Sequence, residues 1–248
     1  MPFDRVWIQQ LGQGALGRES RLVSECFARR GVSAETYLLK RLLRRQVPLT
    51  TGCFLAGDWD CVHAALTQLG VEVPAPLDYP ECLAGFLRRK VWRSTLADVE
   101  RALREGSVGA VFVKPADRQK RFTGRVVTSP YEVFSLGAHG RRDAVLCSEV
   151  VRWRGEQRAY VTGDQIVAID RYEGDATVDV GAVREALATY RASGTAPAAF
   201  AMDFGVLDTG ETALVEVNDG LALGAYEIDG GLYTELLATR WRELVAGV

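Results

Sequence analysis

The chain has 248 residues, of which 48% are hydrophobic and 25% are charged, and its formal net charge is −2 at pH 7. This composition is typical of a globular protein with ample core, in one large or two modest domains, and the charge argues against general nucleic-acid binding. Only two histidines are present, so His-rich metal sites and most His-based catalysis are not expected.

The cysteines and the beginning of the chain bear on its location. Five cysteines form no C-x-x-C pair, and their odd number favours reduced, mostly buried thiols. The opening stretch MPFDRVWIQQ lacks the apolar core of a signal peptide, and no uncharged run reaches the roughly 18 residues that a membrane span needs. We therefore expect a cytoplasmic protein with no membrane or nucleic-acid partner, and a homodimer is left open.

The first part of the chain alternates between strand-like and helix-like patterns. In chain order the patterns predict a strand at 6–10, a helix at 19–30, a strand at 53–57 and a helix ending at Leu69. Residues 34–46 fit either a strand or a basic helix. Asp58 or Asp60 can cap the helix that follows it. Residues 71–80 contain three prolines and predict a linker.

The rest of the chain is richer in strands. The patterns predict helices at 81–92, 95–106 and 179–192, and strands at 110–115, 125–130, 144–151, 157–163 and 165–172. Thr95 and Asp98 have the spacing of a capping box variant at the start of the second helix. The order of these elements predicts a small α/β domain at 1–78 and an α+β region at 79–248.

A glycine motif near the N-terminus allows two interpretations. Gly12, Gly14 and Gly17 follow a strand and precede a helix, as a dinucleotide-binding loop requires. The acidic residue expected about 20 positions further on is missing, and Lys40 and Arg41 in that neighbourhood could instead favour a 2′-phosphate. We favour a structural turn, and a NADP-dependent oxidoreductase remains an alternative.

The sequence AMDFGVLDTGETALVEVNDG predicts a hairpin with Gly210 at its tip. A two-residue loop places Asp203 directly opposite Glu216, with Asn218 on the same face, whereas a three-residue loop would shift the pairing by one. Opposed like charges destabilise a strand pair. Something must therefore neutralise these carboxylates, unless they are a buried acid pair that shares a proton.

Two further regions carry candidate binding residues. Lys114 ends the apolar strand VFVKP, and a cation in that position is expected to point into a site, with Lys120 in the cationic cluster that follows. Cations that face a carboxylate pair suggest a phosphate held by lysines and a divalent metal. Glu149 and Glu156 lie seven residues apart in SEVVRWRGEQRAYV, and Arg158 alternates onto the face of Glu156. Charged clusters and acids such as these also occur on solvated surfaces.

In this order, these residues resemble the ATP-grasp superfamily. The family pattern begins with a lysine before the central domain and a lysine at the end of a strand. A hinge glutamate, a ribose-binding glutamate, a basic residue and an acidic strand paired with E-x-N then follow. The matching residues here are, in the same order, Lys90, Lys114, Glu149, Glu156, Arg158, Asp203, Glu216 and Asn218. The stretches KPADRQKRFTG, GEQRAYV and RYEGD look most like the clade named for one arginine and two lysines. In that clade a lysine-bearing segment replaces the glycine-rich phosphate loop, so Lys120 joins Lys114 as a phosphate-site candidate. The resemblance covers roughly residues 85–248, and the leading portion looks like the short domain that precedes such catalytic regions.

The resemblance implies an ATP-grasp fold, in which two α+β subdomains grip ATP, and a ligase that activates a carboxylate as an acyl phosphate and joins it to an amine. It implies ATP and Mg²⁺ as cofactors, with two ions and Mn²⁺ as an alternative metal, and small-molecule or peptide carboxylates and amines as substrates. The implied roles are ATP binding by Lys90, Lys114, Lys120, Glu149, Val151 and Glu156, metal binding by Asp203, Glu216 and Asn218, and catalysis by Arg158, Lys120 and Arg171. Arg171, Tyr172 and Asp175 in RYEGD are expected to form a substrate-facing rim.

The resemblance also answers the question of the opposed carboxylates. Magnesium between Asp203 and Glu216 would neutralise both, and Asn218 would add a neutral oxygen. Without the metal, we expect Asp203→Asn to leave the protein as stable as before or slightly more stable, because it removes one of two repelling charges. The alternatives on the same fold are a phosphotransferase and a non-catalytic nucleotide-binding module.

Overall fold

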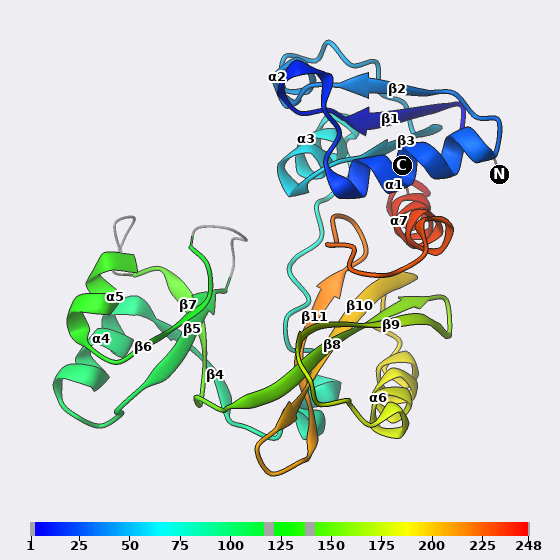
Figure 1. Ribbon diagram of the computed structural model, residues 1–248. Helices are drawn as coiled ribbons and strands as arrows, with labels where there is room; N and C mark the ends of the chain where they lie inside the picture. Colours follow the sequence, from blue (N-terminus) through cyan, green and yellow to red (C-terminus); the bar gives the residue numbers. More distant parts are fainter. Residues whose placement is uncertain (1–2, 117–121, 137–141, 248) are drawn as a thin grey trace.

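The structure is a computed structural model that describes residues 3–116, 122–136 and 142–247. Its named strands form three separate sheets that follow one another along the chain (Figure 1). We call the three parts the N-terminal domain (residues 3–69), the central lobe (residues 91–148) and the C-terminal lobe (residues 153–219). This mixture of parallel and antiparallel sheets with helices confirms the predicted α/β and α+β class.

The N-terminal domain contains a parallel sheet of order β2-β1-β3. Its elements are β1 (Arg5–Gln9), the 3-10 turn η1 (Gly12–Gly14), α1 (Arg18–Arg29), β2 (Ala34–Tyr37), α2 (Leu39–Leu43), β3 (Cys53–Ala56) and α3 (Trp59–Leu69). Residues 34–46, which fit either a strand or a helix, form both in succession. Asp58 caps α3 by accepting a hydrogen bond from the Cys61 amide at 3.0 Å, as its position predicts.

The central lobe is an antiparallel sheet of order β4-β7-β5-β6, against which two helices pack their apolar side chains. Its elements are β4 (Val91–Thr95), α4 (Leu96–Arg104), β5 (Val111–Pro115), β6 (Arg125–Val127), α5 (Pro130–Leu136) and β7 (Ala144–Ser148). The 3-10 helix η2 (Glu81–Phe86), which precedes β4, packs instead in the core of the C-terminal lobe. The Asp98 amide donates to Thr95 Oγ1 at 3.2 Å, which confirms the predicted cap at the start of α4.

The helix predicted at 81–92 is wrong over its second half. The 3-10 helix η2 stops at Phe86, and Arg88 has φ of +51°, in the left-handed region that a right-handed helix cannot contain. Val91 then begins β4, whose backbone pairs with β7. Pairing in the sheet, which the local pattern cannot show, decides the structure of these residues.

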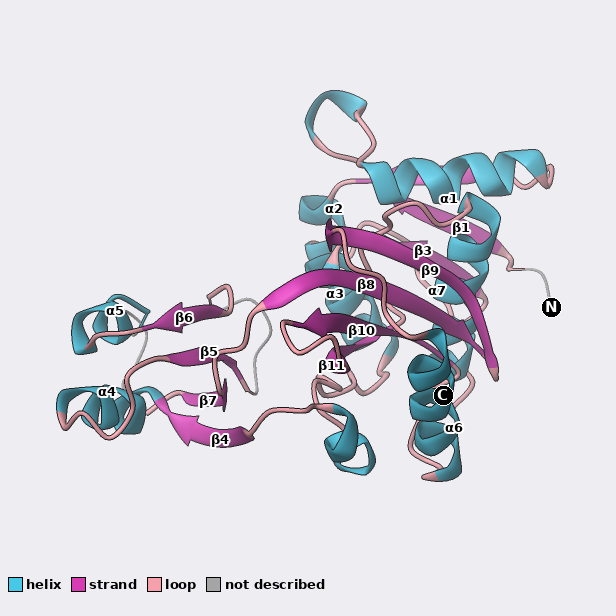
Figure 2. Cartoon of the chain, turned by 60° about the horizontal axis from the view of Figure 1, so that its bottom comes forward, coloured by secondary structure: helices cyan, strands magenta, loops and turns pink. Residues whose placement is uncertain are grey.

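The C-terminal lobe is an antiparallel sheet of order β11-β10-β8-β9, in which β8 and β9 are the long curved strands of Figure 2. Its elements are β8 (Trp153–Thr162), β9 (Gln165–Gly174), α6 (Val180–Ala192), β10 (Ala199–Leu207) and β11 (Thr212–Asp219). Side chains of α6 pack on one face of this sheet, and the other face contributes Tyr160 and Ala201 to the core of the N-terminal domain. All residues of β10 are therefore buried.

The last helix, α7 (Gly230–Val245), returns to the N-terminal domain and lies beside α1 (Figure 1). Trp241 donates from Nε1 to the Cys53 carbonyl at 2.7 Å and meets the Phe54 ring edge-on. The sequence patterns predict no helix at these residues, so only the structure reveals this contact between the two ends of the chain. The domain boundary at 78/79 stays a prediction. Within the described residues, no helix combines the length and apolarity that crossing a membrane requires.

The hairpin of β10 and β11 has the predicted pairing where it matters for the site. Asp203 lies opposite Glu216. Nearer the tip the pairing shifts by one, with Val215 as the extra residue of a β-bulge, and Gly210 has φ of +87°. The tip therefore follows the three-residue alternative, and the bulge restores the register expected for a two-residue loop.

Candidate active site

A cleft of about 430 Å³ opens where the central lobe meets the C-terminal lobe. Both sheets and the segment that connects them contribute side chains, and charged groups stand beside aromatic and aliphatic ones. The lining residues are Tyr79, Arg89, Phe112, Lys114, Gly124, Val126, Ser148, Glu149, Val150, Val151, Trp153, Glu156, Tyr172, Val215 and Glu216. A cleft with apolar walls and a few convergent polar groups is the usual form of a ligand site.

Several of the predicted site residues meet at this cleft. Lys114, Glu149, Val151 and Glu156, four of those expected to bind ATP, all line it, as does Glu216 of the expected metal set. These residues come from β5, β8, β11 and the connecting segment, so the fold brings together positions that are far apart in the sequence.

Other predicted residues lie elsewhere. Lys90 is exposed, with its Nζ 5.7 Å from the centroid of the Trp92 ring, and is not among the described residues that line the cleft. Arg171 is exposed on β9, donates to Thr177 Oγ1 at 2.9 Å and is not among the described residues that line the cleft. Lys120 falls outside the described residues.

The segment between β7 and β8 forms one wall of the cleft. Its start is fixed by two hydrogen bonds, from the Glu149 amide to the Lys90 carbonyl at 3.0 Å and from the Lys90 amide to Glu149 Oε2 at 2.9 Å. Val150 is 46% exposed, and residues 149–152 belong to no strand. The backbone of Val150 and Val151 is therefore not committed to a sheet.

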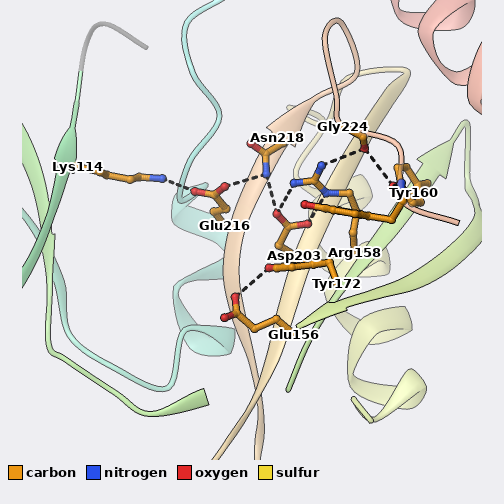
Figure 3. Close-up of polar contacts among 10 residues, drawn as sticks. Lys114, Glu156, Arg158, Tyr160, Tyr172, Asp203, Glu216, Asn218 and Gly224 are labelled. Carbon is orange, nitrogen blue, oxygen red and sulfur yellow. Dashed lines mark hydrogen bonds and ion pairs between the residues drawn. The ribbon is translucent and has the colours of Figure 1, made fainter. Parts of the chain in front are cut away.

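Asp203 and Arg158 form a buried ion pair next to the cleft (Figure 3). They are neighbours on β10 and β8, and Arg158 donates from Nε to Oδ1 at 2.8 Å and from Nη2 to Oδ2 at 2.7 Å. Asp203 is only 2% exposed. Burial raises the pKa of Asp203, while the hydrogen bonds and the charge of Arg158 oppose that shift. The chain itself thus supplies a cation that neutralises this carboxylate.

Glu216 and Lys114 form a second ion pair, which joins the two lobes (Figure 3). Lys114 Nζ lies 2.7 Å from Glu216 Oε2 and 2.6 Å from Asp78 Oδ1. Burial would lower the pKa of Lys114, but Glu216, Tyr79 and Asp78 raise it above its ordinary value. Burial likewise opposes ionisation of Glu216, yet Lys114 holds the pKa of Glu216 below its ordinary value.

Asn218 links the two carboxylates through its amide nitrogen, and its Oδ1 would face a cation between them only after the amide turns over. Its Nδ2 donates to Asp203 Oδ2 at 3.0 Å and to Glu216 Oε1 at 3.1 Å. In the described part of the chain, no group of three or more His, Cys, Asp or Glu could hold a metal ion. Two carboxylates and an amide nevertheless fit Mg²⁺, which prefers oxygen and commonly takes one or two carboxylates with phosphate and water completing its shell.

Glu156 is held by a tyrosine from the neighbouring strand. Tyr172 donates from its hydroxyl to Glu156 Oε2 at 2.9 Å, and its ring stacks on Tyr226 with centroids 4.9 Å apart. Burial raises the pKa of Glu156, and the Tyr172 hydrogen bond opposes this shift. Tyr172, expected on a substrate-facing rim, therefore also orients a carboxylate inside the cleft.

Comparison with known families shows which family the chain belongs to. The model of an ATP-grasp domain family, the second family of the clade named for one arginine and two lysines, matches residues 86–236, which is more than half of the chain. The chain belongs to this clade of the ATP-grasp superfamily. The matched region includes every predicted site residue and begins after the linker, so the N-terminal domain lies outside it. A search among curated proteins finds no match.

Several solved structures share the fold of almost the whole chain. D-alanyl-alanine synthetase A from Vibrio cholerae has 13% identity and a TM-score of 0.60, with 100% of both chains covered. D-alanine–D-alanine ligase from Bacillus anthracis, complexed with ATP, has 14% identity and a TM-score of 0.57, over 98% of this chain and 97% of that one. Macrocyclase MdnC from Microcystis aeruginosa, bound with the precursor peptide MdnA, has 12% identity and a TM-score of 0.54, over 94% and 99%. The predicted ATP-grasp fold is confirmed.

Arg89 is a site residue of this ATP-grasp protein that sequence reasoning missed. It lines the cleft and donates from Nη1 to the Leu214 carbonyl at 2.7 Å and from Nη2 to the Val215 carbonyl at 2.9 Å. Its guanidinium also lies over the ring of Trp153, 5.3 Å from the centroid. The run FLRRKVW signals cations here, but the sequence cannot show which of three neighbours points inward.

The glycine motif forms a turn in the ATP-grasp protein's N-terminal domain. Gly12 and Gly14 belong to η1, and Gly17 is the N-cap of α1. In the described part of the chain, a Cβ added at any of the three meets no atom within 4 Å. None of the three is among the described residues that line the cleft. The structural interpretation of the motif agrees with this placement.

Proposed function

We propose that this protein is an ATP- and Mg²⁺-dependent ligase that activates a carboxylate as an acyl phosphate and joins it to an amine. The observation that carries the proposal is the meeting of Lys114, Glu156 and Glu216 in one cleft between two lobes, with Asp203 and Asn218 beside them. Membership of the ATP-grasp superfamily supports ATP as the bound nucleotide.

In this proposal ATP lies along the cleft with its base against the connecting segment. The backbone of Val150 and Val151 pairs with the adenine edge, and Glu149 holds the segment through its bonds to Lys90. Glu156 accepts hydrogen bonds from the ribose hydroxyls, because Tyr172 occupies only its Oε2. Lys114 offsets the charge of the phosphates, and Lys120 and the exposed Lys90 remain candidates for the same role.

The divalent cation would be held by Asp203, Glu216 and Asn218. Held there, Mg²⁺ would supply positive charge that offsets the charge developing on the phosphates. For Glu216 to bind the cation, its ion pair with Lys114 must give way to the new ligand. Lys114 can then turn its charge to the phosphates. Breaking one ion pair thus frees Glu216 for the cation and Lys114 for the phosphates.

The reaction proceeds in two steps that balance atoms and charge. A carboxylate oxygen attacks the γ-phosphorus, the bond to the β-phosphate oxygen breaks, and ADP leaves. The amine nitrogen then attacks the acyl carbon, inorganic phosphate leaves with its electron pair, and the nitrogen loses a proton. Arg158, beside the cation site, is the candidate for steadying the acyl phosphate, and Arg171, Tyr172 and Asp175 are the proposed substrate rim.

The test is a screen of ADP release against pools of carboxylates and amines, with mass spectrometry of the products. The pools include small molecules and peptides, because the similar structures comprise a D-alanyl-alanine synthetase and a macrocyclase bound with a precursor peptide. We expect ADP release to require both an acid and an amine, with an adduct that has lost one water. ADP release with a phosphorylated hydroxyl and no amine requirement would instead establish a phosphotransferase.

A further inference from the structure

The linker between the N-terminal domain and the central lobe meets the cleft at Tyr79, which lines it, and at Asp78, which binds the cleft residue Lys114. The Asp78 carbonyl accepts a hydrogen bond from the Val217 amide at 2.8 Å, and the two residues form an isolated β-bridge. Val217 lies between Glu216 and Asn218 on β11, so the bridge fixes the linker beside the proposed cation ligands. The Asp78 carboxylate meets Lys114 at 2.6 Å.

The backbone of Asp78 is held in a conformation that few side chains adopt. Its φ is +44°, in the left-handed region where aspartate and asparagine are tolerated better than most residues. Such conformations persist where the surrounding structure imposes them, and they gather at functional sites. Here the bridge to Val217 and the ion pair with Lys114 impose it together.

Lys114 consequently stands between two carboxylates. Its side chain is 11% exposed, its Nζ lies 4.6 Å from the centroid of the Tyr79 ring, and Glu216 and Asp78 are both within ion-pair distance. If Glu216 turns to a cation, the ion pair with Asp78 is the contact that still holds Lys114 in the cleft.

We infer that Asp78 is a positioning residue for nucleotide binding: it holds Lys114 in the cleft and so allows Glu216 to exchange Lys114 for a divalent cation. The inference rests on the ATP site proposed above and adds a residue outside the region that matches the family, residues 86–236. The linker is thereby part of the site, although it belongs to neither lobe.

The test uses Asp78→Asn, which keeps the shape and the tolerance of a positive φ but removes the charge. Glu72→Gln is the matched control, since it makes the same charge change at another position of the same linker. Isothermal titration with Mg²⁺ and the non-hydrolysable analogue adenylyl imidodiphosphate measures affinity for the parent, both variants, Lys114→Met and the double variant of positions 78 and 114. Asp78→Gly, in which glycine accepts the positive φ, serves the same purpose if Asp78→Asn does not fold.

We expect Asp78→Asn to weaken binding by about tenfold or more, Glu72→Gln to stay within about twofold, and the change at Asp78 to have no further effect once Lys114 is methionine. An unchanged affinity in Asp78→Asn would overturn the inference while leaving the ATP site in place. Equal losses in the parent and the Lys114→Met backgrounds would also overturn it, because Asp78 would then act independently of Lys114. A parent protein that binds no analogue would instead refute the proposed site, and the inference with it.

Discussion

Asp203 and Glu216 face each other across one hairpin, yet they belong to two different regions of the molecule. Asp203 is buried inside the C-terminal sheet, where Arg158 from the neighbouring strand holds both of its oxygens. The side chain of Glu216 is 31% exposed, and it meets Lys114 of the central lobe through a single nitrogen. Strand register alone forms the first pair, whereas the second requires two lobes to meet.

The difference shows which carboxylate supports the site and which is available for exchange. Removing one member of a buried ion pair leaves an uncompensated charge, at a cost of about 3–5 kcal/mol. In the second pair only Glu216 is partly exposed, but loss of Glu216 leaves Lys114 paired with Asp78, so we expect a smaller cost of about 1 kcal/mol. We therefore regard Arg158–Asp203 as the fixed support and Lys114–Glu216 as the contact that a bound cation replaces.

The largest effect is expected for Asp203→Asn. This change leaves Arg158 buried without its carboxylate, so we expect the free energy of unfolding to fall by about 3 kcal/mol or more, together with loss of turnover. Charge repulsion alone predicts a variant as stable as the parent, but that argument omits Arg158, which pairs with the buried Asp203. Urea denaturation without nucleotide measures the change. An unaltered denaturation midpoint would mean that the buried ion pair does not stabilise the folded protein.

Glu216→Gln should separate stability from activity. The side chain is partly exposed and glutamine keeps a hydrogen-bonding group, so we expect the free energy of unfolding to change by about 1 kcal/mol or less. Loss of a cation ligand should nevertheless lower magnesium-dependent ADP formation by orders of magnitude. If Glu216→Gln unfolds as readily as Asp203→Asn, the contrast between the two regions disappears.

Glu156→Ala is expected to have a smaller and more selective effect. If Glu156 binds the ribose hydroxyls, the variant should use ATP less well, by about tenfold, while its response to a 2′,3′-dideoxy analogue stays close to that of the parent. The comparison is a double-mutant cycle in which the nucleotide is one partner. Equal losses with both nucleotides would place Glu156 away from the ribose.

Features decided by local chemistry could be predicted from the sequence. The cap at Thr95, the pairing of Asp203 with Glu216 and the position of Lys114 at the end of a strand all depend on neighbouring residues and on the period of a strand. The resemblance to ATP-grasp proteins added the fold and the function class. All of these features could be predicted without knowing which lobes are in contact.

Features decided by distant contacts could not be predicted. Asp78 and Lys114 are brought together by the meeting of linker and sheet, and no spacing in the sequence indicates it. Arg89 rather than Lys90 lines the cleft, and its guanidinium donates to the carbonyls of Leu214 and Val215, which lie far away in the sequence. The neutralisation of Asp203 by Arg158 required the order of strands in the sheet, which places β8 beside β10.

The most direct test of the account compares nucleotide binding in Lys114→Met and Gly12→Ala. Lys114 lines the cleft, whereas Gly12 lies in the glycine motif, where an added Cβ meets no described atom within 4 Å and no positive φ is required. Isothermal titration with Mg²⁺ and the non-hydrolysable ATP analogue should show a loss of about tenfold or more for Lys114→Met and a change within about twofold for Gly12→Ala. A large loss at Gly12 with none at Lys114 would contradict the account and move the nucleotide to the N-terminal domain.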